Sequence, residues 1–306
     1  MITLNPALPN RFMVLEPLKS FADYARAYGD NLARHYEDNG IIIVPKVPID
    51  LDCELINGYV FADVVPKLSN TARPLYVRQG QNLLADSVHP LLVATRGNLI
   101  LATYLQAQFA TFNFQFACGL QLLFPRYRLS ADPSFLWRLT LTENAGQHLD
   151  VFAGGRPWPA DQFRRQRLKA FINIDFAPRH WRVTHDVPGV LAAGHGLLPR
   201  TLPADPNVLN DVINRSGILG RLPWHDLNFP HLAMVIANAE TVAHEVVFGR
   251  RAVSYETTFA TDDMIDPKKS SHYLVGNWLS QAGYIIDDDP SALAGKYVSG
   301  PSGYAA

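Results

Sequence analysis

The second half of the chain contains a succession of short strand-like runs separated by turn residues, and this pattern restricts the fold more than any other feature. The runs are rich in β-branched and aromatic residues: Phe135–Thr142, Leu168–Phe176, Leu232–Asn238, Thr241–Arg251 and Ala252–Phe259. Within the fourth run, Gly249 predicts a turn before Arg250 and Arg251. Several short strands joined by turns are typical of an antiparallel barrel or sandwich.

The rest of the chain predicts helices around this core. Phe21–Asn39 reads as an amphipathic helix, Gly40–Pro45 as a short strand, and Ser270–Gln281 as a helix that packs on the barrel. Asn98–Phe124 carries no charge but is interrupted by polar residues, which favours a buried helix over a membrane span. We therefore expect one α+β domain over 1–306: a helical part to about 130, a core over 131–262, and a helix and tail over 263–306.

Charge and cysteine content narrow the class of protein. The formal net charge is −1 for 306 residues, which argues against nucleic acid as a partner. Cys53 and Cys118 fit no metal-binding spacing and are expected to be reduced and buried, as in a cytoplasmic protein. The first residues lack the basic and apolar segments of a signal peptide. The sequence makes no prediction of the oligomeric state.

The segment His148-Leu149-Asp150 is the feature that carries chemistry. On an extended backbone, residues two apart point to the same side, so His148 and Asp150 can share one metal ion. With a second histidine from a later strand, they would form a facial triad that holds Fe(II) and leaves positions open for O2 and a co-substrate. The alternative pair, His35 and Glu37, lies in a predicted helix, where such residues diverge, and is interpreted as a surface pair.

Seven histidines follow Asp150 and are candidates for the second imidazole: His180, His185, His195, His225, His231, His244 and His272. His244 is the best candidate, because it follows a strongly apolar strand and precedes a glycine turn. His225 and His231 flank a loop and are expected either to face solvent or to line a substrate mouth. The predicted metal ligands, which are also the catalytic group, are therefore His148, Asp150 and His244.

A co-substrate such as 2-oxoglutarate needs a cation for its distal carboxylate. One alternative is Lys169, which shares a strand face with Phe171, with Asn173 as an additional donor. The other is the pair Arg250 and Arg251, which follows His244.

The loop after Asp150 is basic. It contains Arg156, Arg164 and Arg165, followed by Arg167, with Asp161 as a single offsetting carboxylate. If the loop lies over the metal, these arginines would attract an anionic substrate such as a sugar acid or a phosphate. Arg156, Arg164 and Arg165 are therefore the predicted substrate-binding residues.

Three segments together resemble a known family. Leu123–Tyr127, His148–Phe152 and Arg167–Ile174 are similar to the iron- and 2-oxoglutarate-dependent hydroxylases of 3-deoxy-D-manno-oct-2-ulosonic acid (Kdo) in bacterial lipopolysaccharide. Trp181–Val183 and Glu256–Phe259 extend the likeness. The resemblance implies a jelly-roll (cupin-like) double-stranded β-helix with flanking helices, and Fe(II), 2-oxoglutarate and O2 as cofactor and co-substrates. It also implies a cytoplasmic dioxygenase, peripheral to the inner membrane, that hydroxylates a small-molecule or glycolipid anionic substrate.

Other functions are compatible with the same residues. The oxygenase chemistry could act on an amino acid or a natural product instead of a sugar acid. A cupin-like protein could bind a metal or a sugar without oxidising anything. In a non-enzymatic scaffold, His148 and Asp150 would only form hydrogen bonds.

Overall fold

The computed structural model describes residues 2–58, 91–92, 95–131, 133–150, 165–203 and 206–287. Its helices are α1 (Phe21–Tyr28), α2 (Asp30–Glu37), α3 (Cys53–Gly58), α6 (Leu99–Leu123), α7 (Val187–Ala193), α8 (Pro206–Arg215) and α9 (Ser271–Gln281), with 3-10 turns η1 (Leu219–Arg221), η2 (Thr261–Asp263) and η3 (Pro267–Lys269). Its strands are β1 (Ile2–Thr3), β2 (Phe12–Val14), β3 (Ile41–Val44), β4 (Ser134–His148), β5 (Arg165–Asn173), β6 (Arg179–Asp186), β7 (Thr201–Pro203), β8 (His225–Phe229), β9 (Met234–Ala237), β10 (Val242–Ala260) and β11 (Ile285–Asp287).

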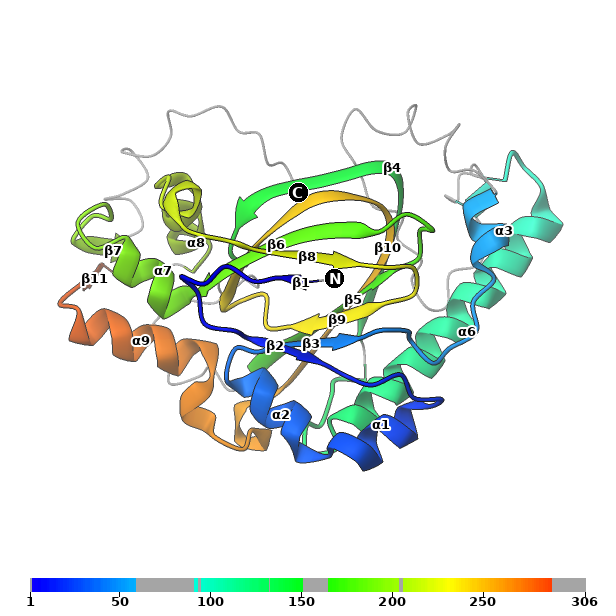
Figure 1. The fold of residues 1–306 in the computed structure, drawn as a ribbon, viewed down its shortest axis with the longest axis horizontal. Coiled ribbons are helices and arrows are strands. Elements are labelled where there is room, and N and C mark those ends of the chain that lie inside the picture. Colours follow the sequence, from blue (N-terminus) through cyan, green and yellow to red (C-terminus); the bar gives the residue numbers. More distant parts are fainter. Residues whose placement is uncertain are drawn as a thin grey trace.

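Strand β10 organises the sheet because its two halves pair with different strands. Its first half pairs with β6, with His244 opposite Val183, and its second half pairs with β5, with Tyr255 opposite Ala170. Strand β4 runs antiparallel along β10. The strand order is β1-β8-β6-β10-β5-β9-β3-β2, with β4 on β10, and Figure 1 shows the curled sheet that results. The two halves of β10 thus join two parts of one curled sheet, and the predicted jelly-roll core with flanking helices is confirmed.

The turn predicted at Gly249 is wrong, because β10 continues through it as one strand. The pairing with β4 shifts register on both sides of Gly249, so bulges bend the strand without ending it. A Cβ at this position would lie 2.3 Å from Nη1 of Arg179. Glycine is needed here for the close passage of a guanidinium group, and a local sequence pattern cannot separate that need from a turn.

The alternation of side chains divides a barrel interior from an outer face that packs on helices. On β3, Ile41 belongs to the interior cluster, whereas Ile42 packs outward. Strand β5 divides in the same way, with Ala170 outward and Phe171 inward. Lys169 lies two residues before Phe171 and therefore faces the interior, as the sequence pattern predicted.

The segment before α6 contributes more than helices, because β1 pairs with β8 and β3 pairs with β9. Phe21–Asn39 forms two helices instead of one, since Gly29 adopts φ 49° between α1 and α2. The long helix has the predicted bounds, and Asn98 caps it by accepting a hydrogen bond from the backbone N–H of Leu101. Only one of its faces is buried, since Ile100 and Phe114 are exposed, so the prediction of a buried helix is wrong for the other face. In Figure 1, α1, α2 and α6 lie along one side of the sheet. No helix of the described part combines the length and hydropathy needed to cross a membrane.

Glu37 is buried, so its interpretation as half of a surface pair is wrong. It is 3% exposed and accepts hydrogen bonds from the hydroxyl of Tyr127 and from the backbone N–H groups of Ile265 and Asp266. The segment after β10 folds back over the end of α2 and covers this carboxylate. Burial of this kind depends on residues more than 200 positions away, and a helical pattern cannot reveal it.

The two cysteines are free thiols, as predicted, but only Cys53 is buried. Cys118 is exposed because it lies on the face of α6 opposite the core residues Phe116 and Leu120. The prediction that both cysteines are buried is therefore wrong for Cys118.

Helices α7, α8 and α9 build a second, smaller core at one end of the sheet (Figure 1). Helix α9 matches the predicted helix Ser270–Gln281 closely. Leu149 and Ala243 both lie in this core and are fully buried. Each is a chain neighbour of a predicted metal ligand, so this small core fixes the backbone on both sides of the predicted site.

Candidate metal centre

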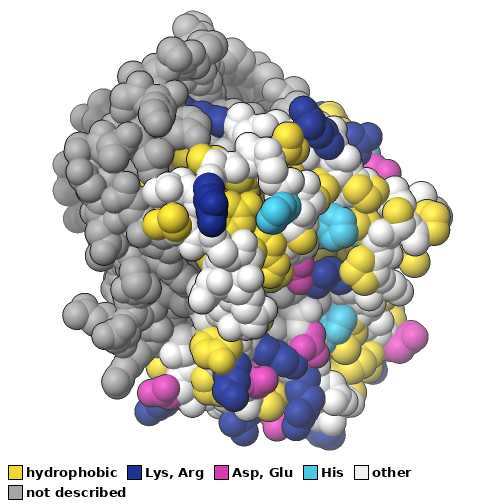
Figure 2. All heavy atoms as spheres, turned by 90° about the vertical axis from the view of Figure 1, so that its left-hand side faces the viewer, with side chains coloured by type: hydrophobic (Ala, Val, Ile, Leu, Met, Phe, Trp, Pro, Cys, Tyr) yellow, Lys and Arg dark blue, Asp and Glu magenta, His cyan; other side chains and the backbone are white. Residues whose placement is uncertain are grey.

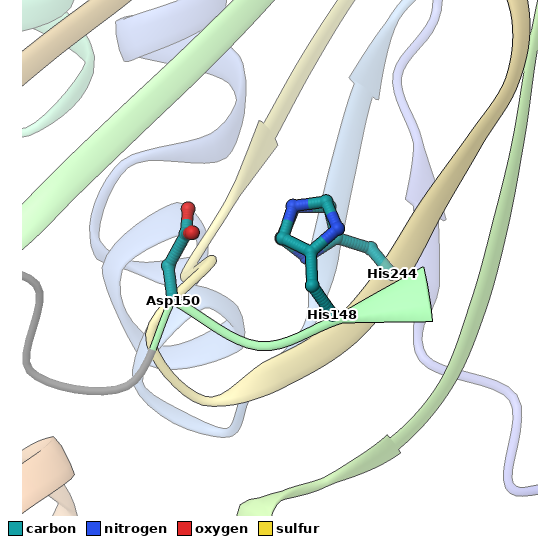
Figure 3. Close-up of side chains that lie close together, drawn as sticks. All are labelled: His148, Asp150 and His244. Atoms are coloured by element: carbon teal, nitrogen blue, oxygen red, sulfur yellow. The ribbon is translucent and has the colours of Figure 1, made fainter. Parts of the chain in front are cut away.

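His148, Asp150 and His244 come together where β4 ends. His148 and His244 are directly opposite one another in the antiparallel pair of β4 and β10, with ring centroids 4.2 Å apart. One ligand atom from each of the three residues lies within 4.8 Å of the others. In Figure 3 the three side chains gather on one side of the backbone, with Asp150 on the segment that follows β4. Two imidazoles and one carboxylate therefore converge on a single point.

The residues beside the ligands hold them in this orientation. Leu149 and Ala243 point outward into the core of α7, α8 and α9, and adjacent residues on extended backbone point to opposite sides. The ligands therefore turn toward the barrel interior. The backbone N–H of Asp150 also donates to the carbonyl of Ala239, which ties the segment after β4 to the loop before β10.

Asn214 on α8 clamps the middle residue of the His-x-Asp segment. Its Oδ1 accepts from the backbone N–H of Leu149 at 3.0 Å, and its Nδ2 donates to the carbonyl of the same residue at 3.3 Å. Both backbone polar groups of Leu149 are thus satisfied by one side chain. No local pattern marks Asn214, because it lies 65 positions away, and sequence reasoning missed it.

Both imidazoles are held with one nitrogen available for a metal. Nδ1 of His148 lies 2.5 Å from the carbonyl of Gly146, and Nδ1 of His244 lies 3.0 Å from the carbonyl of Val242. Since a carbonyl only accepts, each Nδ1 carries the proton and each Nε2 presents its lone pair. Burial, followed by the neighbouring His148, lowers the pKa of His244 to about 3, so its ring is neutral at neutral pH.

Asp150 is ionised, and Lys169 is its counter-ion. Burial alone would raise the pKa of Asp150, but Lys169 and the two imidazoles outweigh it and hold the pKa well below its usual range. Nζ of Lys169 lies 2.6 Å from Oδ2 of Asp150 and 3.5 Å from Oε2 of Glu256. The donor set is therefore two imidazoles and one carboxylate, which fits a divalent iron ion bound through a facial triad.

The other predicted anchors of a co-substrate lie away from the triad and bind other groups. Asn173 donates to the carbonyls of Ala177 and Phe229. Arg250 makes two hydrogen bonds to the buried carboxylate of Asp175, at 2.8 and 2.9 Å. Arg251 donates to Oδ1 of Asn57 at 2.9 Å. Of the four predicted residues, the structure places Lys169 at the triad.

Most of the predicted basic loop lies outside the described residues. Arg156 and Arg164 lie outside the described residues, and Arg165 is exposed at the start of β5. Arg167 is 8% exposed, with its guanidinium 3.1 Å from Glu256 and 3.5 Å from Glu240, so its charge is already balanced. Figure 2 shows the face that carries α7 to α9, where the described basic side chains along the lower edge lie beside acidic ones.

Three other described histidines, His225, His231 and His180, contact groups outside the triad. His225, expected at a solvent-facing or mouth position, is buried on β8, with its ring nitrogens 2.9 and 3.2 Å from the N–H of Asn5 and the carbonyl of Pro9. His231 is half-buried, with Nδ1 3.1 Å from the carbonyl of Asp175. His180 pairs with Asp226 at 2.7 Å.

An apolar pocket opens beside His244 in the barrel interior. Its walls are contributed mainly by β6, β9 and β10, through residues such as Trp181, Val235 and Val242. The ring of Trp181 stacks on that of His244, with centroids 5.8 Å apart and an interplanar angle of 25°. The pocket is small and apolar, and it lies next to the metal ligand His244. The alternation of Trp181 and Val183 on β6 could have indicated this inward face from the sequence.

Two histidines and one aspartate that converge in a jelly-roll barrel have the donor set of the facial-triad class of metal sites. No family model and no curated protein sequence matches the chain. The fold, however, is similar to solved structures of the Kdo hydroxylase KdoO, described as a non-haem Fe(II) α-ketoglutarate-dependent dioxygenase.

The structure of KdoO with succinate and Fe(III) matches with a TM-score of 0.65 and 16% sequence identity, over 88% of this chain and 96% of that chain. The same shares and identity apply to apo KdoO, with a TM-score of 0.63, and to KdoO with α-ketoglutarate and Fe(III), with a TM-score of 0.62. These matches establish that this chain shares the fold of KdoO over nearly its whole length.

Proposed function

We propose that this protein is an Fe(II)- and 2-oxoglutarate-dependent dioxygenase that hydroxylates a C–H bond of an anionic substrate. The observation that carries the proposal is the convergence of His148, Asp150 and His244 within 4.8 Å, in a barrel of the KdoO type. Iron bound by such a triad supplies activation of O2, with 2-oxoglutarate as the reductant that is converted to succinate and CO2.

The chain's own residues supply binding and orientation. His148 and His244 offer Nε2 lone pairs because their Nδ1 protons are held by backbone carbonyls. Asp150 supplies the single carboxylate, which leaves positions open on the metal. Lys169 is the predicted co-substrate residue whose ammonium lies at the triad, so we propose that it contributes to 2-oxoglutarate binding. The apolar pocket beside His244 excludes water from the ligand.

For the substrate, we propose a Kdo-type sugar acid of lipopolysaccharide. Two features support an anionic substrate: the exposed Arg165 at the start of β5, and the loop with Arg156 and Arg164 between Asp150 and that strand. A carboxylate-bearing sugar would gain from these charges. Such a substrate, attached to a lipid anchor, would bring the enzyme to the cytoplasmic face of the inner membrane.

The test is turnover with purified protein, Fe(II), 2-oxoglutarate and O2, read as succinate release. Kdo, Kdo-containing glycolipid, phosphorylated glycans and neutral amino acids are compared as substrates, with Asp150→Ala as the inactive control. We expect release to depend on the sugar acid and to fall several-fold when Arg164 and Arg165 are both changed to Glu. Efficient turnover of a neutral amino acid, indifferent to salt and to this charge reversal, would refute the sugar-acid proposal. Absence of an anaerobic Fe(II)–2-oxoglutarate absorption band would refute the oxygenase proposal as a whole.

A further inference from the structure

Trp181 has a polar group that no described residue satisfies. Its side chain is 2% exposed, and its Nε1 has no hydrogen-bond partner. Buried donors are almost always paired, so an unpaired one is a candidate to bind an acceptor on a ligand. Trp137, an equally buried tryptophan in the helical core, shows the ordinary state: its Nε1 donates to Oδ1 of Asn113 at 3.1 Å.

The position of Trp181 connects this donor to the candidate metal centre. Trp181 lines the apolar pocket that also includes His244. Val183 is paired with His244 across β6 and β10, and Trp181 lies two residues further along the same face of β6. Two residues of strand correspond to about 6.6 Å. The carbon chain of 2-oxoglutarate, with four bonds of about 1.5 Å, spans about 5 Å from end to end. The ring centroids of Trp181 and His244 are 5.8 Å apart, so the indole ring lies about one ligand length from this metal ligand.

The charge near Trp181 favours an anionic acceptor. The guanidinium carbon of Arg179 lies 5.9 Å from the centre of the Trp181 ring, and Arg179 is 2% exposed. Gly249 leaves the space through which this guanidinium passes. A buried cation beside the Trp181 ring raises the local potential, because the low dielectric of the interior screens it weakly. Lys169, in contrast, lies at the metal end, 2.6 Å from Asp150.

We infer that Trp181 donates its indole N–H to the distal carboxylate of 2-oxoglutarate, with the charge of Arg179 behind the ring, while Lys169 serves the metal end. This inference rests on the proposed function. It assigns the distal carboxylate to a donor that was not among the residues predicted from the sequence.

The experiment compares 2-oxoglutarate with 2-oxopentanoate, which has the same length but no distal carboxylate. Binding of each to the Mn(II)-loaded protein is measured by titration calorimetry for the parent and for Trp181→Phe. The phenyl ring keeps the apolar wall and removes the donor. We expect Trp181→Phe to weaken the binding of 2-oxoglutarate about tenfold or more, which is the range for a hydrogen bond to a charged group. The affinity for 2-oxopentanoate should change by less than about threefold. The thermal midpoint of the ligand-free variant should fall less than that of Trp137→Phe, because both changes remove the same buried ring atoms but Trp181→Phe loses no satisfied hydrogen bond.

Two further variants make the result decisive. Trp137→Phe is the matched control: it should lower the thermal midpoint, since it leaves Asn113 without its donor, and keep both affinities. Gly249→Ala displaces the guanidinium of Arg179 without touching the pocket, and should reproduce the selective loss even if Trp181→Phe folds poorly.

The inference would be overturned if Trp181→Phe weakened the binding of both ligands equally. It would also be overturned if Trp181→Phe and Gly249→Ala both kept the parent affinity for 2-oxoglutarate. A selective loss confined to Lys169→Met would overturn it as well. A parent protein that binds neither ligand would instead refute the proposed function itself.

Discussion

Replacing Lys169 by Met should change the stability of the metal-free protein and its metal affinity in opposite directions. In the metal-free state, the ammonium group neutralises Asp150 from a distance of 2.6 Å. When a divalent cation binds the same carboxylate, the ammonium becomes a like charge beside it. Methionine has a similar length and no charge, so the substitution removes both effects together.

The structure sets the size of each effect. Unit charges about 4 Å apart interact by about 4 kcal/mol at an effective dielectric constant of about 20. Breaking a fully buried ion pair costs about 3–5 kcal/mol. Because the two side chains are 14% and 24% exposed, we expect a smaller loss for the metal-free protein, about 1–3 kcal/mol. That loss corresponds to a fall of roughly 2–6 °C in the thermal midpoint of a chain of this size. Removing the repulsion should tighten binding of a divalent metal about tenfold or more, or about 1.4 kcal/mol.

The assay is thermal unfolding without metal, together with competitive titration of Mn(II). Lys169→Arg, which keeps the charge, should resemble the parent in both measurements. Lys268→Met, at an exposed position on η3, controls for the loss of a surface lysine. If Lys169→Met bound metal more weakly than the parent and unfolded at the same temperature, the coupling between this ammonium and Asp150 would be refuted.

Three further predictions concern the metal ligands, the residue that positions them and a buried carboxylate of the fold. Alanine at His148 or His244 should abolish tight Fe(II) binding in calorimetric titration. His225→Ala is the control and should bind iron normally, because the His225 ring contacts Asn5 and Pro9. Normal iron binding by His244→Ala would show that His244 is not the second histidine ligand. Asn214→Leu should weaken metal binding about 10- to 100-fold, the range for residues that orient ligands, and parent-like affinity would rule out a positioning role for this clamp. Glu37→Ala should cost about 2–5 kcal/mol in urea unfolding, because a phenol and two backbone N–H groups lose their buried acceptor; Glu37→Gln should lose less, and equal losses would show that these hydrogen bonds contribute little.

The sequence predicted those parts of the site that depend on local geometry. The spacing of His148 and Asp150 and the alternation around Lys169 follow from an extended backbone, and both side-chain directions agree with the structure. His244 was selected for its place after an apolar strand, and the structure sets it opposite His148. Whether these three residues hold iron remains a prediction for the binding experiments.

What the sequence could not predict depends on which distant residues meet. Arg250 is an ordinary basic residue in the sequence, and only the fold shows that its guanidinium donates to the carboxylate of Asp175. The clamp by Asn214 and the unsatisfied donor of Trp181 are likewise properties of tertiary contacts. The turn predicted at Gly249 is absent because a strand bulge that makes room for a guanidinium group can have the same local composition as a turn.

The continuity of β10 through both parts of the curled sheet limits how the length of this chain can change during evolution. Val246 packs into the barrel interior and Val253 packs against the helices, and each orientation depends on the count of residues between them. Loss or gain of one residue at 247–251 would invert every side chain on one half of the strand. Either His244 would leave the triad, or the apolar residues after Arg251 would leave the main core. Single-residue insertions and deletions at 247–251 should therefore be selected against, whereas segments outside the sheet can change in length without inverting side chains.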